Sequence, residues 1–63
     1  MDIQLFSDTN YRNMLDDLDE TYGMYLPIGA DSDNLRIAVD EDVMDDPRFW
    51  EMLADNGGEI ISH

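Results

Sequence analysis

The chain is 63 residues long, and its sixteen carboxylates against three arginines and no lysine set the formal net charge at -13. Such a surface is repelled by DNA, RNA and anionic lipid, because proteins bind those partners through Lys and Arg side chains that neutralise the phosphates. We therefore expect the partner to be a basic protein, and we expect neither direct nucleic-acid binding nor membrane binding.

Apolar residues make up 43% of the chain, which is more than an acidic disordered segment carries. They predict a folded core, and a chain of this length forms one small domain. We therefore predict a single small acidic domain over residues 1–63. Cysteine is absent, and the sequence shows neither a signal peptide nor a long apolar run, so the expected location is the cytoplasm.

The first clear pattern along the chain is an amphipathic helix over Thr9–Tyr22. Its apolar residues recur at intervals of three and four, at Tyr11, Met14, Leu15, Leu18 and Tyr22. Ser7, Asp8 or Thr9 is expected to supply the N-cap. Gly23 is expected to end the helix, because glycine tolerates the backbone conformation that closes many helices.

The middle of the chain predicts an antiparallel hairpin. Its arms are Met24–Ile28 and Leu35–Val39, and the turn between them is Gly29–Asn34. Apolar residues alternate with others in the second arm, which is typical of a half-buried strand. Pro27 has no N–H for a central ladder, so the first arm is expected to lie at an edge or to bend.

A second helix is predicted after Asp46-Pro47, because an N-cap residue followed by proline is a common helix start. It should end by Asn56-Gly57-Gly58. Phe49 and Leu53 share one face of this helix, and Trp50 projects to the side.

Together these elements predict a small α+β domain in which two short helices pack on an antiparallel β-hairpin. The terminal segments Asp2–Phe6 and Glu59–His63 are short and partly apolar. Each is predicted to add an edge strand. A hairpin alone is only marginally stable, so it is expected to pack against at least one helix.

Enzymatic chemistry is not expected, since the chain has no Cys, no Lys and a single His at residue 63. Without a neighbouring base, the hydroxyls of Ser7, Ser32 and Ser62 have nothing to activate them as nucleophiles. We therefore predict a non-enzymatic protein with no cofactor.

Two acidic stretches resemble the EF-hand loop that binds calcium, one beginning at Asp31 and the other at Asp40. Both lack the glycine needed at the sixth position of that loop. Each also places an apolar residue, Leu35 or Met44, where an oxygen ligand is required. We therefore predict no dedicated metal site.

The carboxylates themselves form the candidate binding site, in two acidic rows. The first row is Asp16, Asp17, Asp19 and Glu20, and the second row is Asp40, Glu41, Asp42, Asp45 and Asp46. Carboxylates ~5–6 Å apart on a helix face can imitate the phosphates of DNA, which carry one charge per ~1.7 Å of duplex axis. The predicted function is that of an acidic regulator or inhibitor that binds a basic, nucleic-acid-binding protein.

The arginines lie in three separate predicted elements, at Arg12, Arg36 and Arg48, and form no basic stripe of the kind that binds nucleic acid. Each is expected to pair with a neighbouring carboxylate. For Arg12 the expected partner is Asp8 or Asp16.

In size and charge, the chain with these two acidic rows is similar to small acidic accessory proteins of bacteriophages, some of which are anti-restriction or anti-CRISPR proteins that mimic DNA. The likeness covers size and charge. It implies a viral inhibitor that acts in the host cytoplasm on a nucleic-acid-binding protein.

Two alternatives use apolar surface in place of charge. In the first, the acidic aromatic helix lies in a groove of its partner and uses Phe49, Trp50 and Leu53 as anchors. In the second, surplus apolar surface at Met24, Tyr25 or Trp50 makes the protein a homodimer. Repulsion between protomers of charge -13 opposes a dimer unless the acids cluster away from the interface.

Overall fold

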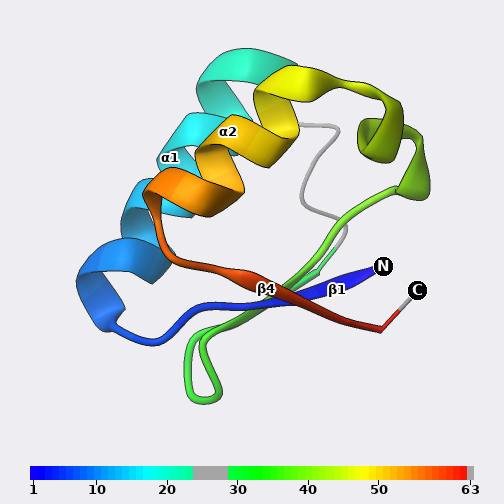
Figure 1. Cartoon of the computed structure of the whole chain (residues 1–63). Coiled ribbons are helices and arrows are strands. Elements are labelled where there is room, and N and C mark those ends of the chain that lie inside the picture. Colours follow the sequence, from blue (N-terminus) through cyan, green and yellow to red (C-terminus); the bar gives the residue numbers. More distant parts are fainter. Residues whose placement is uncertain (24–28, 63) are drawn as a thin grey trace.

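The computed structural model describes residues 1–23 and 29–62. In chain order the elements are β1 (Asp2–Gln4), α1 (Asp8–Tyr22), β2 (Gly29–Asp31), β3 (Arg36–Ala38), the 3₁₀ helix η2 (Glu41–Asp45), α2 (Pro47–Asp55) and β4 (Glu59–Ser62). The strands form one antiparallel sheet in the order β2-β3-β1-β4, and both α-helices lie on the same side of it (Figure 1). The predicted small α+β domain is confirmed.

The helix α1 forms as its apolar spacing predicts. Ser7 is the N-cap, and its hydroxyl oxygen accepts the N–H of Asn10 at 3.1 Å. Gly23 ends the helix with a φ of 74°, a conformation that side chains disfavour, and its N–H donates to the carbonyl of Asp19. The stripe of buried side chains that faces the sheet is Tyr11, Met14 and Leu18.

The hairpin differs from the prediction in where it turns. The strand β2 occupies Gly29–Asp31, which the prediction assigned to the turn, while the predicted first arm Met24–Ile28 lies outside the described residues. The reason is the Asp31 carboxylate, whose Oδ1 accepts the N–H groups of Asp33 at 3.1 Å and Asn34 at 3.2 Å. These bonds favour a turn after Asp31, and Leu35 closes it with a φ of 57°.

The strand β1 is central, so the prediction of an edge strand for Asp2–Phe6 is wrong. Ile3 pairs with Ile37 of β3 on one side and with Ile60 of β4 on the other. Ile3 and Leu5 have no exposed surface. A segment with two such side chains is best covered in the middle of the sheet, where both helices lie over it. The predicted C-terminal edge strand is confirmed as β4.

The second helix begins and ends as predicted. Asp46 is the N-cap of α2, Pro47 is its first residue, and Asn56 is its C-cap. Phe49 and Leu53 are buried in the core. The turn of 3₁₀ helix before it, η2, was not predicted.

The core lies between the sheet and the two helices. Its buried apolar side chains come from every layer and are Ile3, Leu5, Tyr11, Met14, Leu18, Ile37, Val39, Val43, Phe49 and Leu53. Within residues 1–23 and 29–62, no helix is long and apolar enough to cross a membrane.

Candidate functional site

The first acidic row lies on α1 opposite its buried stripe. Asp16, Asp19 and Glu20 are exposed, because they fall on the side of the helix that faces away from the sheet. Asp17 is half-buried, and its Oδ2 accepts a hydrogen bond from Nδ2 of Asn56 at 3.1 Å. Asp17 therefore holds the end of α2 against α1, while the other three carboxylates point to solvent.

The second row is divided in the same way between structural and free carboxylates. Asp40 is the N-cap of η2, and its Oδ1 accepts the N–H of Asp42 at 3.0 Å. The buried side chain of Val43 anchors η2 to the core. Glu41, Asp42 and Asp45, the remaining acids of η2, are exposed and hold no side-chain hydrogen bond among the described residues; only Asp40 and Asp46 of this row serve as caps.

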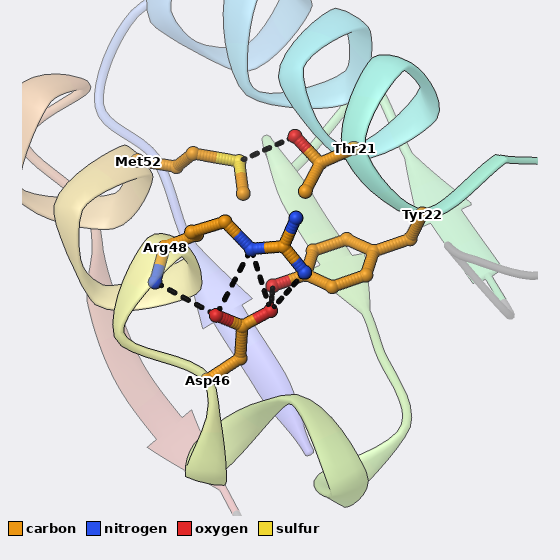
Figure 2. A network of polar contacts seen from close by, with 5 residues as sticks. All are labelled: Thr21, Tyr22, Asp46, Arg48 and Met52. Carbon is orange, nitrogen blue, oxygen red and sulfur yellow. Dashed lines mark hydrogen bonds and ion pairs between the residues drawn. The ribbon is translucent and has the colours of Figure 1, made fainter.

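Asp46 is the most heavily bonded carboxylate of the second row. Its Oδ1 accepts the backbone N–H of Arg48 at 2.9 Å, and its Oδ2 accepts the Tyr22 hydroxyl at 2.8 Å and Nη2 of Arg48 at 2.8 Å. Figure 2 shows the Arg48 guanidinium and the Tyr22 hydroxyl both directed at this carboxylate, which lies at the junction of η2 and α2. Asp46 therefore caps α2 and binds α1 at the same time.

The electrostatics of this junction follow from its bonds. The side-chain and backbone hydrogen bonds of Arg48, followed by that of Tyr22, hold the pKa of Asp46 well below its usual range. Burial and the hydrogen bond to Asp46 raise the pKa of Tyr22 to about 12. The Arg48 guanidinium also lies over the Tyr22 ring, 5.6 Å from its centroid, where it gains a cation–π contact.

The Tyr22–Asp46 bond joins the C-terminal end of α1, which carries the first row, to the junction of η2 and α2, which carries the second row. Tyr22 is the last residue of α1 and lies one turn beyond Asp19. Asp46 directly follows Asp45, the last residue of η2. The free carboxylates of the two rows, Asp16, Asp19 and Glu20 on α1 and Glu41, Asp42 and Asp45 on η2, are here called the acidic end.

The acidic end has no arginine partner among the described residues. Arg48 forms the ion pair found there, with Asp46 at 2.8 Å. Arg12 is exposed and forms no ion pair with any residue in 1–23 or 29–62, so the expected pairing with Asp8 or Asp16 is wrong. An exposed ion pair gains little in water and must order two side chains, which explains its absence.

The aromatic helix presents little of its apolar surface. Phe49 has no exposed surface and Leu53 is 5% exposed, whereas Trp50 is 39% exposed. The Trp50 indole N–H donates to the carbonyl of Met44 at 2.8 Å, and its ring packs edge-on against Phe49. Trp50 therefore joins η2 to α2.

The two stretches that resemble calcium loops have other roles. The carboxylates of Asp31 and Asp40 bind backbone N–H groups of their own turns, as described above. Hydrogen bonds from the side chain and the backbone N–H of Asn34 lower the pKa of Asp31. Across the part of the chain that the structure describes, no group of three or more His, Asp or Glu side chains is placed to hold a metal ion.

The expected pairing of Arg48 with a neighbouring carboxylate is confirmed, with Asp46 as the partner. The sequence did not predict the bonds that Tyr22 and Asn56 make to carboxylates of the two rows. In the sequence, Tyr22 is one more member of the apolar stripe of the first helix, and Asn56 marks the end of the second helix. The Tyr22–Asp46 bond spans 24 positions of the chain and the Asn56–Asp17 bond spans 39, so no local sequence pattern predicts them.

No family model, curated protein or solved structure matches the chain.

Proposed function

We propose that the protein is a non-enzymatic acidic regulator or inhibitor that binds a basic, nucleic-acid-binding protein through the acidic end. One observation carries the proposal. The exposed carboxylates of α1 and η2 have no arginine partner among the described residues, and the Tyr22–Asp46 bond joins the end of α1 to the η2–α2 junction.

The chemistry of such a surface matches that of a nucleic-acid backbone. Carboxylates three or four residues apart on a helix lie ~5–6 Å from each other, so Asp16 is within this distance of both Asp19 and Glu20. A basic groove built for phosphates can accept charges at that spacing, and complementary potentials speed the encounter of two proteins. These carboxylates repel one another, so their arrangement does not stabilise the fold.

The attachment of the acidic end to the core also favours binding. Both rows are tied to the core, α1 through its buried stripe and η2 through Val43, and the Asp46 bonds hold α1 against the junction of η2 and α2. A surface that is already ordered loses less entropy when a partner binds.

The alternative in which α2 lies in a groove of the partner receives less support. Two of its three anchors, Phe49 and Leu53, are in the core, and the indole N–H of Trp50 is already bonded. To use those anchors, α2 would have to leave the sheet and expose the core of a small domain.

The test is a pull-down with immobilised protein from a cell lysate, in low and high salt, with duplex DNA as the competitor. The test variant carries Asp16→Asn, Asp19→Asn and Glu20→Gln. The matched control carries Asp33→Asn, Glu51→Gln and Asp55→Asn, which removes the same charge from exposed positions outside the acidic end. We expect the wild type and the control to retain nucleic-acid-binding proteins that duplex DNA displaces. The test variant should bind them about tenfold more weakly.

Equal loss in both variants would mean that net charge alone is responsible. The proposal would be contradicted if neither salt nor duplex DNA changed the amount of protein captured and if the three amide substitutions also left it unchanged. Loss of capture in a folded Trp50→Ala variant, with the amide variant unaffected, would favour the groove-bound helix.

A further inference from the structure

Trp50 is the aromatic side chain of α2 that reaches solvent. It is 39% exposed, whereas Phe49 beside it has no exposed surface. The indole N–H is the hydrogen-bonding group of the ring, and it already donates to the carbonyl of Met44 at 2.8 Å. The exposed part of the ring is therefore carbon and π surface, which a partner can contact without forming a hydrogen bond to it.

The bond to Met44 places this ring next to an unpaired carboxylate. Asp45 directly follows Met44, so it is one residue from the carbonyl to which the indole is bonded. Asp45 is exposed, and it forms no ion pair within residues 1–23 and 29–62. An aromatic ring and a free anion therefore lie together at the junction of η2 and α2.

The same junction shows what a ring and a carboxylate can hold. The guanidinium of Arg48 bonds to Asp46, with Nη2 at 2.8 Å from Oδ2, and it lies over the ring of Tyr22, 5.6 Å from the centroid (Figure 2). The ring attracts the cation electrostatically, while the carboxylate accepts its N–H groups. On this side of α2 the chain itself supplies the arginine.

Trp50 and Asp45 receive no such cation from the chain. Among the described residues, the cation–π contact is that of Arg48 with its tyrosine. Arg36 was expected to pair with a neighbouring carboxylate, but its Nε donates to Oε1 of Gln4 on the sheet, at 2.9 Å. The chain has no lysine. A cation for this second ring and carboxylate must therefore come from another molecule.

We propose that Trp50 and Asp45 form the docking site for an arginine side chain of the partner protein. The proposal rests on the proposed function, in which the partner is basic, and it names the group through which that partner is held. A guanidinium is planar and weakly hydrated, so it can stack on the ring and bond to the carboxylate at once. The ammonium of lysine is compact and strongly hydrated, and it suits the ring less well.

Other occupants fit this site less well. An apolar side chain would cover the ring, but it would also take water from the Asp45 carboxylate and replace none of its hydrogen bonds. An anionic group would be repelled by the same carboxylate and by the net charge of -13. Arginine satisfies both the ring and the acid.

The docking site adds a short-range contact to the long-range attraction of the acidic end. Exposed carboxylates speed the encounter with a basic protein, and salt screens them over about 8–10 Å. Contact between a guanidinium and Trp50 acts only once the two proteins touch. Tryptophan and arginine are also the residues that most often dominate the binding energy of an interface. We therefore expect Trp50 to matter more to the dissociation rate than to the association rate.

The experiment uses Trp50 as its own probe, because it is the single tryptophan of the chain. Two peptides of equal charge, hexa-arginine and hexa-lysine, are titrated into the full chain at about 0.15 M salt. We expect hexa-arginine to change the fluorescence of Trp50 and to bind about threefold more tightly than hexa-lysine.

Variants are compared by calorimetry with the same two peptides. Trp50→Leu removes the ring and keeps an apolar side chain, and the matched control is Phe6→Leu, since Phe6 is 61% exposed between β1 and α1. We expect Trp50→Leu to lose the preference for hexa-arginine and Phe6→Leu to keep it. Asp45→Asn should weaken the binding of hexa-arginine more than Asp55→Asn, which removes an exposed charge at the other end of α2.

The proposal would be overturned if the wild type bound both peptides equally, or if a folded Trp50→Leu variant kept the preference for hexa-arginine. Circular dichroism reports whether each variant is folded. Should Trp50→Leu fail to fold, the comparison of Asp45→Asn with Asp55→Asn decides in its place, and equal weakening by these two variants would overturn the proposal.

The pull-down described above separates this proposal from the proposed function. If capture depends on Asp16, Asp19 and Glu20 but is the same for a folded Trp50→Leu variant, the arginine site is wrong and the proposed function stands. If the wild type captures no nucleic-acid-binding protein, the proposed function is wrong, whatever the two peptides show at Trp50.

Discussion

The helices α1 and α2 are held in place in different ways. The longer helix, α1 (Asp8–Tyr22), has an N-cap and a buried stripe, and the carboxylates on its outer side have no partner among the described residues. The shorter helix, α2 (Pro47–Asp55), is bonded to other elements at its two ends, where Asp46 accepts the Tyr22 hydroxyl and Asn56 donates to Asp17, and on its flank, where Trp50 donates to Met44.

This difference shows that acidic residues have two separate uses in one small fold. A helix of nine residues is marginal by itself, and the carboxylate of Asp46 at its start helps to hold it. The longer helix is held by its buried stripe, by the Ser7 cap and by the Tyr22–Asp46 and Asp17–Asn56 bonds, and its outer acids take part in none of these contacts. The substitutions below test that contrast, from the largest expected effect to the smallest.

The largest effect is expected from removing the core anchor of α2. Phe49→Ala deletes a ring with no exposed surface and should lower the free energy of unfolding by about 3–5 kcal/mol. The total for a chain of this length is only about 3–9 kcal/mol, so much of the protein should unfold. Urea denaturation followed by circular dichroism measures this. Glu51→Ala, on the exposed side of the same helix, should change the value by less than about 0.5 kcal/mol.

A smaller loss is expected when the bond between α1 and the η2–α2 junction is removed. Tyr22→Phe keeps the ring and deletes the hydroxyl that donates to Asp46, which should cost about 1–2 kcal/mol of stability. Tyr11→Phe is the matched control, since Tyr11 is buried in the core and its hydroxyl has no such bond among the described residues. Equal losses in the two variants would show that the Asp46 contact is not what joins the helices.

The same bond predicts how stability depends on alkaline pH. The pKa of Tyr22 is about 12 in the folded protein, above the ordinary value of 10.0. Tyr22 ionises at a lower pH in the unfolded chain than in the folded protein. The stability that Tyr22 contributes is therefore fully present below about pH 10 and is lost as the pH rises toward 12. Thermal unfolding at a series of pH values should show this decline in the wild type. The Tyr22→Phe variant should show less of it, and parallel curves would contradict the assignment.

The smallest effect on the fold is expected from the outer side of α1. Asp16 and Glu20 are four residues apart and repel each other, so Asp16→Asn with Glu20→Gln should leave stability unchanged or raise it by about 0.2–0.5 kcal/mol. Urea denaturation provides the measurement. A clear loss of stability would mean that these carboxylates support the helix, and the contrast with α2 would then fail.

Much of the fold was predictable because its signals are local. The spacing of Tyr11, Met14 and Leu18 predicts α1, and the pair Asp46-Pro47 predicts the start of α2. The turn of the hairpin was not predictable in the same way. Glycine is typical of turns, and the sequence therefore places Gly29 in the turn. In the structure Gly29 is a strand residue, because the Asp31 carboxylate organises a turn further along the chain.

The candidate site was predictable as a set of residues, although its division into free and structural carboxylates was not. Asp45 and Asp46 are equivalent in the sequence, as two neighbouring aspartates. In the structure Asp46 bonds to Tyr22 and Arg48, whereas Asp45 is exposed. Asp17 differs from Asp16 for a similar reason, because the amide of Asn56 reaches it from the other helix.

The sequence by itself determined the charge, the two helices and the amphipathic pattern that buries one side of α1, because these depend on residue type and on spacing over a few positions. The tertiary structure alone decided that β1 is central, that Tyr22 at the end of α1 bonds to Asp46 between η2 and α2, and that Asp17 of α1 bonds to Asn56 at the end of α2. Those features depend on contacts between residues far apart in the chain, and such contacts form only when the sheet and the helices bury their apolar sides against each other.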